Sequence, residues 1–201
     1  METRQADIHG VIATQVRTRR AQLALSLEGL SARSGVSRSM ISLIERGEAS
    51  PTAVVLERLA WAFGVPLARL FDEPEDATTA PAPVARRAEQ VEWRDPGSGY
   101  RRRNLSPARW PSPIHLVEIE FPPGAKVSYE TTHREPAMAQ QVWLLSGRLT
   151  IDLGRTRHEL HAGDCLAMRL EQPVTFANPG RAKARYVVAV CTERCVGRAR
   201  P

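Results

Sequence analysis

Residues 35–51 read GVSRSMISLIERGEASP, a short amphipathic run that begins after one glycine and ends at another, before a proline. Ser37 can cap a helix because its hydroxyl can accept a hydrogen bond from a free N–H group in the first turn. We expect this helix to run to about Arg46 and to end at Gly47, a residue that readily adopts the left-handed conformation. The residues expected to face outward from it are Arg38, Ser39, Ser42 and Leu43.

Apolar residues recur at helical spacing over the whole of residues 8–71, which predicts five short helices. The first spans about 8–22, Ser26 can cap the second, and Pro51 is expected at the first position of the fourth. A tight turn at Ser34-Gly35 joins the second helix to the short third one. Two helices in this arrangement form a helix-turn-helix, whose second helix places its first residues in the DNA major groove. The partial positive charge at the start of that helix also suits phosphate.

The stretch LSLEGLSARSGVSRSMISLIERGEASPTAVVLERLAWAFGVPLARLF, residues 25–71, resembles the phage-repressor (Cro/XRE) class of helix-turn-helix domains. The resemblance implies that Glu45 pairs internally with Arg20 and so has a structural role. The chain departs from the pattern at Leu27 and Leu43, where polar residues are common in the class, so the base preference stays open. The DNA-binding residues that the resemblance implies are Ser26, Ser37, Arg38, Ser39, Ser42, Leu43 and Arg46.

Residues 72–85, DEPEDATTAPAPVA, separate two halves of different composition. The prolines, small residues and acids of this stretch have no apolar period and cannot build a core. We therefore expect a helix-turn-helix domain at 1–71, a flexible acidic linker at 72–88 and a β domain at 89–201. The β domain has short runs of Val, Leu, Thr and Trp cut by turns, which favour a sandwich or barrel, with one corner expected at Ser146-Gly147. The fold class is thus an all-α domain followed by an all-β domain.

The second half resembles a cupin, a double-sheet β-barrel of the jelly-roll kind, from roughly residue 90 to 194. The short sequence motifs PGA, WLLSGRLTI, AGDCL and NPG match the turns of that family in order. Cupins typically hold a divalent metal through His and Glu side chains, and the resemblance places these positions at His133, Glu135, Gln140 and Val174. An amide and a valine leave too few good ligands for a tight site. No metal and no cofactor is therefore expected.

A barrel without a metal still encloses a cavity, in which a few polar groups can fix the orientation of a small molecule. Donors and acceptors cluster along the strands that would line it, and they suit a small polar or zwitterionic effector. The alternative is that these groups are satisfied core residues. The run YRRRN at 100–104 is expected to be a solvated edge or hairpin tip. The expected effector-binding residues are Tyr129, His133, Glu135 and Gln140.

The overall composition restricts the class of protein without naming a partner. The formal net charge is +6 and the isoelectric point is about 9.9, but only Lys126 and Lys183 among the 28 basic residues are lysines. No apolar run approaches the roughly 20 residues of a membrane span, and the N-terminus lacks the layout of a signal peptide. The three cysteines have no framework spacing, which is typical of reduced thiols in a cytosol. We expect a cytoplasmic protein.

These features together favour a bacterial, sequence-specific transcriptional regulator, a repressor that responds to a small polar molecule in its cupin domain, and not an enzyme. One helix-turn-helix covers half of an operator, so we expect a homodimer on palindromic double-stranded DNA. Two alternatives stay open. The barrel could serve only for dimerisation in a ligand-blind regulator, or the chain could be a metal-dependent cupin enzyme with a DNA-binding head.

Overall fold

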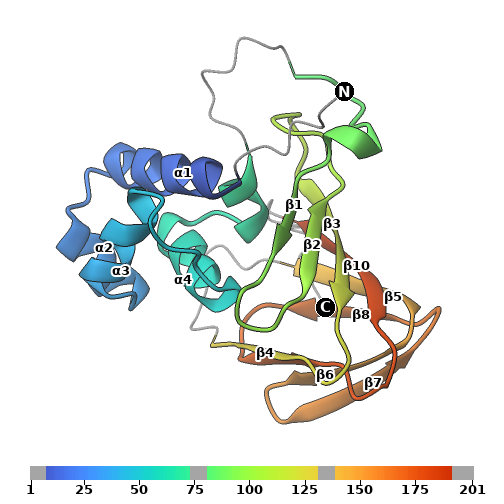
Figure 1. Ribbon diagram of the computed structural model, residues 1–201. Helices are drawn as coiled ribbons and strands as arrows, with labels where there is room; N and C mark the ends of the chain where they lie inside the picture. Colours follow the sequence, from blue (N-terminus) through green and yellow to red (C-terminus); the bar gives the residue numbers. More distant parts are fainter. Residues whose placement is uncertain (1–7, 73–80, 131–138, 192–201) are drawn as a thin grey trace, which may run out of the picture.

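The computed structural model of the 201-residue chain describes residues 8–72, 81–130 and 139–191, and it shows a helical part followed by a two-sheet β-barrel (Figure 1). The predicted class, all-α and then all-β, is confirmed. The fifth of the expected helices is a short 3₁₀ helix rather than an α-helix. The helical elements are α1 (Ile8–Gln22), α2 (Leu27–Ser34), α3 (Arg38–Glu45), α4 (Ala53–Phe63) and the 3₁₀ helices η1 (Leu67–Phe71) and η2 (Arg87–Glu89).

Capping side chains set where the helices begin. Ser26 and Ser37 each accept a hydrogen bond from the N–H three residues further on, at 3.0 and 3.3 Å, so both predicted caps are confirmed. The prediction that Pro51 opens the fourth helix is wrong. Thr52 supplies the cap and α4 begins at Ala53, because the Thr52 hydroxyl satisfies an N–H group of the first turn.

Within the part of the chain that the structure describes, ten antiparallel strands form two sheets that pack face to face. The larger sheet has the order β1-β2-β3-β10-β5-β8 and the smaller has the order β4-β9-β6-β7. Buried and exposed residues alternate along most strands, so one face of each sheet lines the interior of the barrel. The strands are β1 (Glu92–Arg94), β2 (Arg101–Asn104), β3 (Ile114–Phe121), β4 (Lys126–Tyr129), β5 (Ala139–Ser146), β6 (Arg148–Leu153), β7 (Thr156–His161), β8 (Cys165–Arg169), β9 (Val174–Ala177) and β10 (Ala184–Cys191).

Gly147 makes the corner at which the chain leaves β5 in the large sheet for β6 in the small one. Its φ is +85°, and a Cβ atom placed on it would lie 2.7 Å from the carbonyl oxygen of Lys183. The corner predicted at Ser146-Gly147 is therefore confirmed, and a side chain at position 147 has neither the backbone conformation nor the space it needs.

The helical part and the barrel share one hydrophobic core. A row of aromatic rings crosses the boundary from η1 into the barrel, with successive centroids 5.4 to 6.2 Å apart. Because each ring packs against the next, a shift of η1 would displace the rings inside the barrel. The rings, in order, belong to Phe71, Trp93, Tyr100, Phe121, Tyr186 and Phe176.

Polar contacts reinforce this junction. The carboxylate of Asp95, which is 2% exposed, accepts a hydrogen bond of 2.8 Å from the N–H of Ala53 at the start of α4. It also accepts bonds from the N–H and hydroxyl of Ser98, at 2.7 and 2.6 Å. The barrel thus places a negative charge at the N-terminus of a helix of the other part, where the helix dipole favours it. The division into domains at residues 71 and 89 stays a prediction, and residues 73–80 of the expected linker lie outside the described residues.

Replacing Asp95 with alanine is expected to lower the free energy of unfolding of the full chain by about 2 kcal/mol, since it removes charge-assisted hydrogen bonds from buried N–H groups. Urea denaturation followed by circular dichroism measures the change. The variant Asp95→Asn keeps one acceptor oxygen and is expected to lose less. An alanine variant as stable as the parent would show that this carboxylate does not hold the two parts together.

Candidate functional site

The start of α3 presents a small polar surface. Arg38 and Ser39 are exposed, and the Ser39 hydroxyl lies 3.2 Å from the hydroxyl of Ser37. Ile41 and Ile44 are fully buried on the opposite side of the helix. Figure 1 places α2 and α3 at the end of the helical part that is farthest from the barrel. The first turn of α3 is therefore free to approach a partner.

The other expected DNA-binding residues differ in how available they are. The Arg46 guanidinium donates to the Ser42 hydroxyl and forms two hydrogen bonds with Glu48, at 2.8 and 2.7 Å. The hydrogen bond to Glu48 raises the pKa of Arg46 and lowers that of Glu48. Leu43 is half-buried and Ser26 is occupied as the cap of α2. Arg38 and Ser39 thus remain the best placed for base contact, and the role of all seven residues stays a prediction.

A bidentate ion pair fixes α3 against α1. Arg20 donates from Nε and Nη2 to the two carboxylate oxygens of Glu45, at 2.7 and 2.8 Å, and from Nη1 to the Leu25 carbonyl at 3.0 Å. The Glu45 carboxylate raises the pKa of Arg20 through these hydrogen bonds. The pairing that the resemblance implied is confirmed, and it sets the angle at which α3 is held.

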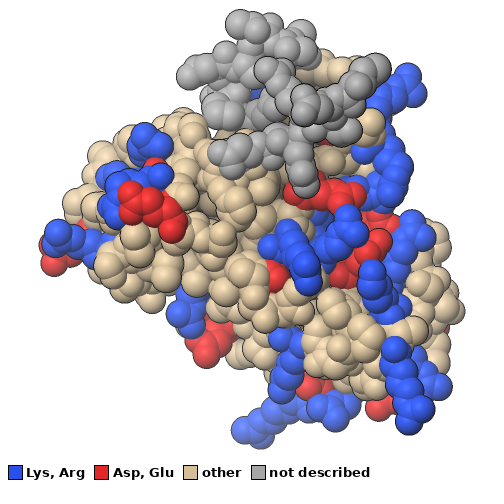
Figure 2. Space-filling view, in the orientation of Figure 1, with Lys and Arg blue, Asp and Glu red and all other residues tan. Residues whose placement is uncertain are grey.

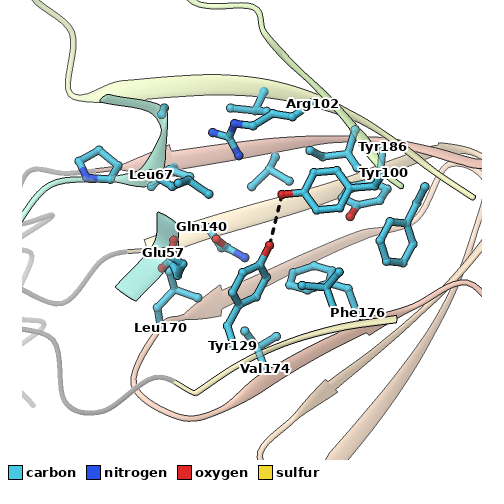
Figure 3. Close-up of a pocket in the computed structure, with 18 residues that line it drawn as sticks. Glu57, Leu67, Tyr100, Arg102, Tyr129, Gln140, Leu170, Val174, Phe176 and Tyr186 are labelled. Carbon is cyan, nitrogen blue, oxygen red and sulfur yellow. Dashed lines mark hydrogen bonds between the residues drawn. The ribbon is translucent and has the colours of Figure 1, made fainter. Parts of the chain in front are cut away.

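A second candidate site is a cavity of about 90 Å³ in the mouth of the barrel (Figure 3). Its walls are the inner faces of the two sheets, together with residues of α4 and of the segment around η1. Tyr129 and Gln140, two of the expected effector-binding residues, both line it. The other two, His133 and Glu135, lie outside the described residues. Effector binding by this set stays a prediction.

Most polar groups in the cavity are hydrogen-bond donors with weak partners. The hydroxyls of Tyr100 and Tyr129 face each other at 3.5 Å, and the Gln140 amide donates to the sulfur of Met168 at 3.6 Å. Burial raises the pKa of Tyr100, and raises those of Tyr129 and Tyr186 well above the usual range. All three phenols therefore stay protonated and can donate at physiological pH.

Arg102 is a functional candidate that sequence reasoning missed. The run at 100–104 was expected to be a solvated edge, but β2 alternates, with Arg101 exposed and Arg102 only 9% exposed. The guanidinium of Arg102 lies 5.3 Å from the centroid of the Phe71 ring and points into the cavity (Figure 3). The sequence does contain a sign of this burial. Side chains alternate between the two faces of a strand, so Arg102 lies on the same face as the aromatic residue Tyr100.

The outer side of the same strands carries a network of ion pairs. Figure 2 shows arginine and acidic side chains interspersed over β1, β2 and β3. Arg101 pairs with Glu92, and Glu118 pairs with both Arg103 and Arg185. The arginines on either side of Arg102 are therefore neutralised on the outer face, while Arg102 is not part of this network.

The two described positions at which the resemblance expects metal ligands do not fit a metal. Gln140 offers an amide and Val174, which is 2% exposed, offers only hydrocarbon. Within residues 8–72, 81–130 and 139–191, no group of three His, Cys, Asp or Glu side chains could hold a metal ion. We therefore assign no chemistry to a metal, and its expected absence stays a prediction.

Comparisons with known proteins agree with this architecture. A helix-turn-helix family matches residues 16–70, and the cupin domain family matches residues 117–190. The chain is 25% identical over 171 residues to the HTH-type transcriptional regulator PuuR of Escherichia coli (strain K12), with 85% of this chain and 89% of PuuR covered. It is 35% identical over 72 residues to the uncharacterized HTH-type transcriptional regulator y4dJ of Sinorhizobium fredii (strain NBRC 101917 / NGR234), and the match covers 36% of this chain and 92% of y4dJ.

A solved structure shares the fold over nearly the whole chain. It is an HTH_3 family transcriptional regulator from Vibrio cholerae, with a TM-score of 0.72 at 22% identity, and the match covers 93% of this chain and 98% of the other. The chain belongs to the XRE family of HTH-type transcriptional regulators, with a helix-turn-helix DNA-binding domain followed by a cupin domain. Among the described residues, no helix is long and apolar enough to span a membrane.

Proposed function

We propose that this protein is a sequence-specific repressor that binds a palindromic operator as a homodimer and responds to a small molecule in the cupin cavity. The observation that carries the proposal is the position of the cavity, whose lining includes Glu57 of α4 and Leu67 of η1. A ligand there would contact the DNA-binding part directly. It can change DNA affinity if it binds more tightly to one arrangement of the two parts than to the other.

The DNA-binding half of the proposal rests on the first turn of α3. Arg38 can form a bidentate pair with guanine, and Ser39 can contact either a base or a phosphate. The free N–H groups at the same helix end suit phosphate. Selection of binding sites from a pool of random duplexes, with the full chain as bait, tests this half. An enriched inverted repeat supports it, and a pool without enrichment contradicts it.

A ligand-blind regulator, whose barrel serves only to dimerise, is the competing function. The two proposals differ in what a bound small molecule does to DNA affinity. If no compound that binds the cavity changes the affinity for the selected duplex, the ligand-blind function holds. The position of Leu67 and Ala68 in the cavity wall favours the sensor, because a purely dimeric barrel has no need to place its cavity against the DNA-binding part.

The outer face of the large sheet offers a surface for the second copy. Trp143 is 51% exposed, Leu116 is 39% exposed and Ile114 is 49% exposed, all on strands of this sheet. Val187 of β10 pairs with Trp143 of β5, and Ala189 pairs with Leu116 of β3, so the apolar surface is continuous across three strands. Exposed apolar patches of this kind mark association surfaces.

Replacing Trp143 with arginine is expected to weaken the dimer about 30-fold, since a buried tryptophan at an interface often contributes 2 kcal/mol or more. Analytical ultracentrifugation over a concentration series measures the dissociation constant. Leu23→Arg is the matched control, because Leu23 is 42% exposed but belongs to the helical part. A Trp143→Arg variant that dimerises like the parent would place the interface elsewhere.

A further inference from the structure

Arg102 carries a positive charge in the cavity, and no acidic side chain of residues 8–72, 81–130 and 139–191 forms an ion pair with it. Arg102 is only 9% exposed. Its Nε atom is buried without a hydrogen-bond partner among those residues. Such groups are rare in native proteins, because a buried donor that loses its water and gains no acceptor destabilises the fold.

The immediate neighbours of this guanidinium do not replace an anion. The Phe71 ring gives a cation–π contact, and the tyrosine oxygens nearby belong to neutral phenols. Burial lowers the pKa of Arg102, and its neighbours Tyr100, Tyr129 and Tyr186 act in the opposite direction. An arginine nevertheless stays protonated in proteins, so the cavity keeps a net positive group.

The other polar groups point to the same ligand chemistry. Tyr100, Tyr129 and Gln140 supply donors that have only long or weak partners, as described above. Figure 3 shows these groups and Arg102 directed into one space. Glu57 is the acidic side chain in the lining among the described residues. An excess of donors around one cation is complementary to an anion.

The remaining walls limit the size and polarity of that anion. They are apolar, formed by residues such as Leu170, Val174, Phe176 and Val188. The volume of about 90 Å³ limits the ligand to a molecule no larger than benzene, which a cavity of roughly 150 Å³ holds. A carboxylate matches the planar fork of a guanidinium and needs one positive charge, whereas a phosphate dianion would need more.

We infer that the effector is a small monocarboxylate, whose carboxylate pairs with Arg102 and accepts hydrogen bonds from Tyr129 and Gln140 while its short apolar chain lies against Val174 and Leu170. This inference rests on the proposed function, because it names the ligand class of the same cavity. Its position also gives a route to the DNA-binding part. The ligand would lie beside the guanidinium that stacks on Phe71, the last residue of η1.

The test uses sodium butyrate as the probe, with butyramide, butylamine, inorganic phosphate and sodium chloride at equal ionic strength as comparisons. Butyrate at saturating concentration is expected to raise the Tm of the full chain by at least about 5 °C, and butyramide to have no effect. Isothermal titration gives the dissociation constant. An equal response to butyramide, a response to phosphate alone, or no response to butyrate or propionate would overturn the inference.

Variants separate a ligand contact from a structural role. Arg102→Met is expected to abolish the butyrate response without lowering the Tm of the ligand-free protein, because an unpaired buried charge is replaced by an apolar chain of similar length. Arg102→Lys keeps the charge but cannot donate two parallel hydrogen bonds to a carboxylate, as a planar guanidinium does. This variant is expected to bind butyrate about 10-fold more weakly. A Met variant that still responds to butyrate contradicts the assignment. If the Met variant fails to fold, Tyr129→Phe is the second variant, because it removes one donor and keeps the ring. It is expected to bind butyrate about 10-fold more weakly, and an unchanged affinity for butyrate contradicts the assignment.

DNA affinity, measured in parallel, separates this inference from the proposed function. Butyrate binding that changes the affinity for the selected duplex supports both. Butyrate binding with unchanged DNA affinity upholds the carboxylate site and contradicts the sensor. A change of DNA affinity with butylamine but not with butyrate upholds the sensor and overturns the carboxylate.

Discussion

Replacing Arg38 with alanine is expected to lower the affinity of the dimer for its selected duplex about 100-fold. A bidentate arginine–guanine pair contributes about 1–3 kcal/mol. Because each operator has two half-sites, a loss near 1.4 kcal/mol in each gives this factor. Arg38 is exposed at the first position of α3 and is not held by an ion pair of the described residues, so its removal should leave the fold intact.

The salt dependence of the same variant distinguishes base contact from phosphate contact. Loss of a base contact relaxes sequence preference at one position, whereas loss of a phosphate contact weakens binding to every sequence and lowers the salt slope. Fluorescence anisotropy on operator and scrambled duplexes over a salt series measures both. Arg155→Ala, in the turn between β6 and β7, is the charge-matched control. Equal affinities of the Arg38 and Arg155 variants would mean that α3 does not read the operator.

Local signals in the sequence were sufficient for the class of fold. The caps at Ser26 and Ser37 and the corner at Gly147 depend on single side chains or on the lack of one, and such features can be recognised without tertiary information. The start of α4 could not be placed in the same way. Ser50, Pro51 and Thr52 all suit a helix start, and the carboxylate of Asp95, 42 residues further on, binds the N–H of Ala53 and stabilises the observed choice.

The cavity was predicted only in part, for a related reason. Tyr129 and Gln140 were recognised because they lie on strands that the cupin resemblance places inside the barrel. Glu57 and Leu67 were not, because they reach the cavity from the helical part, and nothing in the sequence states that the two parts share a core. Arg102 was missed because three consecutive arginines suggest a solvated strand. In the structure the residues of β2 alternate between its two faces, and this alternation buries Arg102 despite the charged composition.

The pair of Arg20 and Glu45 gives the largest expected effect on stability. Replacing Glu45 with alanine is expected to lower the free energy of unfolding by about 3 kcal/mol, because it removes a buried carboxylate and leaves the half-buried Arg20 without its bidentate partner. It would also weaken DNA binding, since the pair holds α3, which presents Arg38, against α1. Urea denaturation measures the first effect and fluorescence anisotropy measures the second.

Glu48→Ala is the matched control for this experiment, because Glu48 also binds an arginine through two hydrogen bonds, but on the surface. The side chains of Arg46 and Glu48 are 50% and 54% exposed, against 21% and 10% for Arg20 and Glu45. Water and salt screen the exposed pair, so its loss should leave stability nearly unchanged. If both variants were equally stable, burial would not be what gives the Arg20–Glu45 pair its effect. The orientation of α3 would then depend on other contacts, among them the packing of Ile41 and Ile44 and the hydrogen bond from Arg17 to the Glu45 carbonyl.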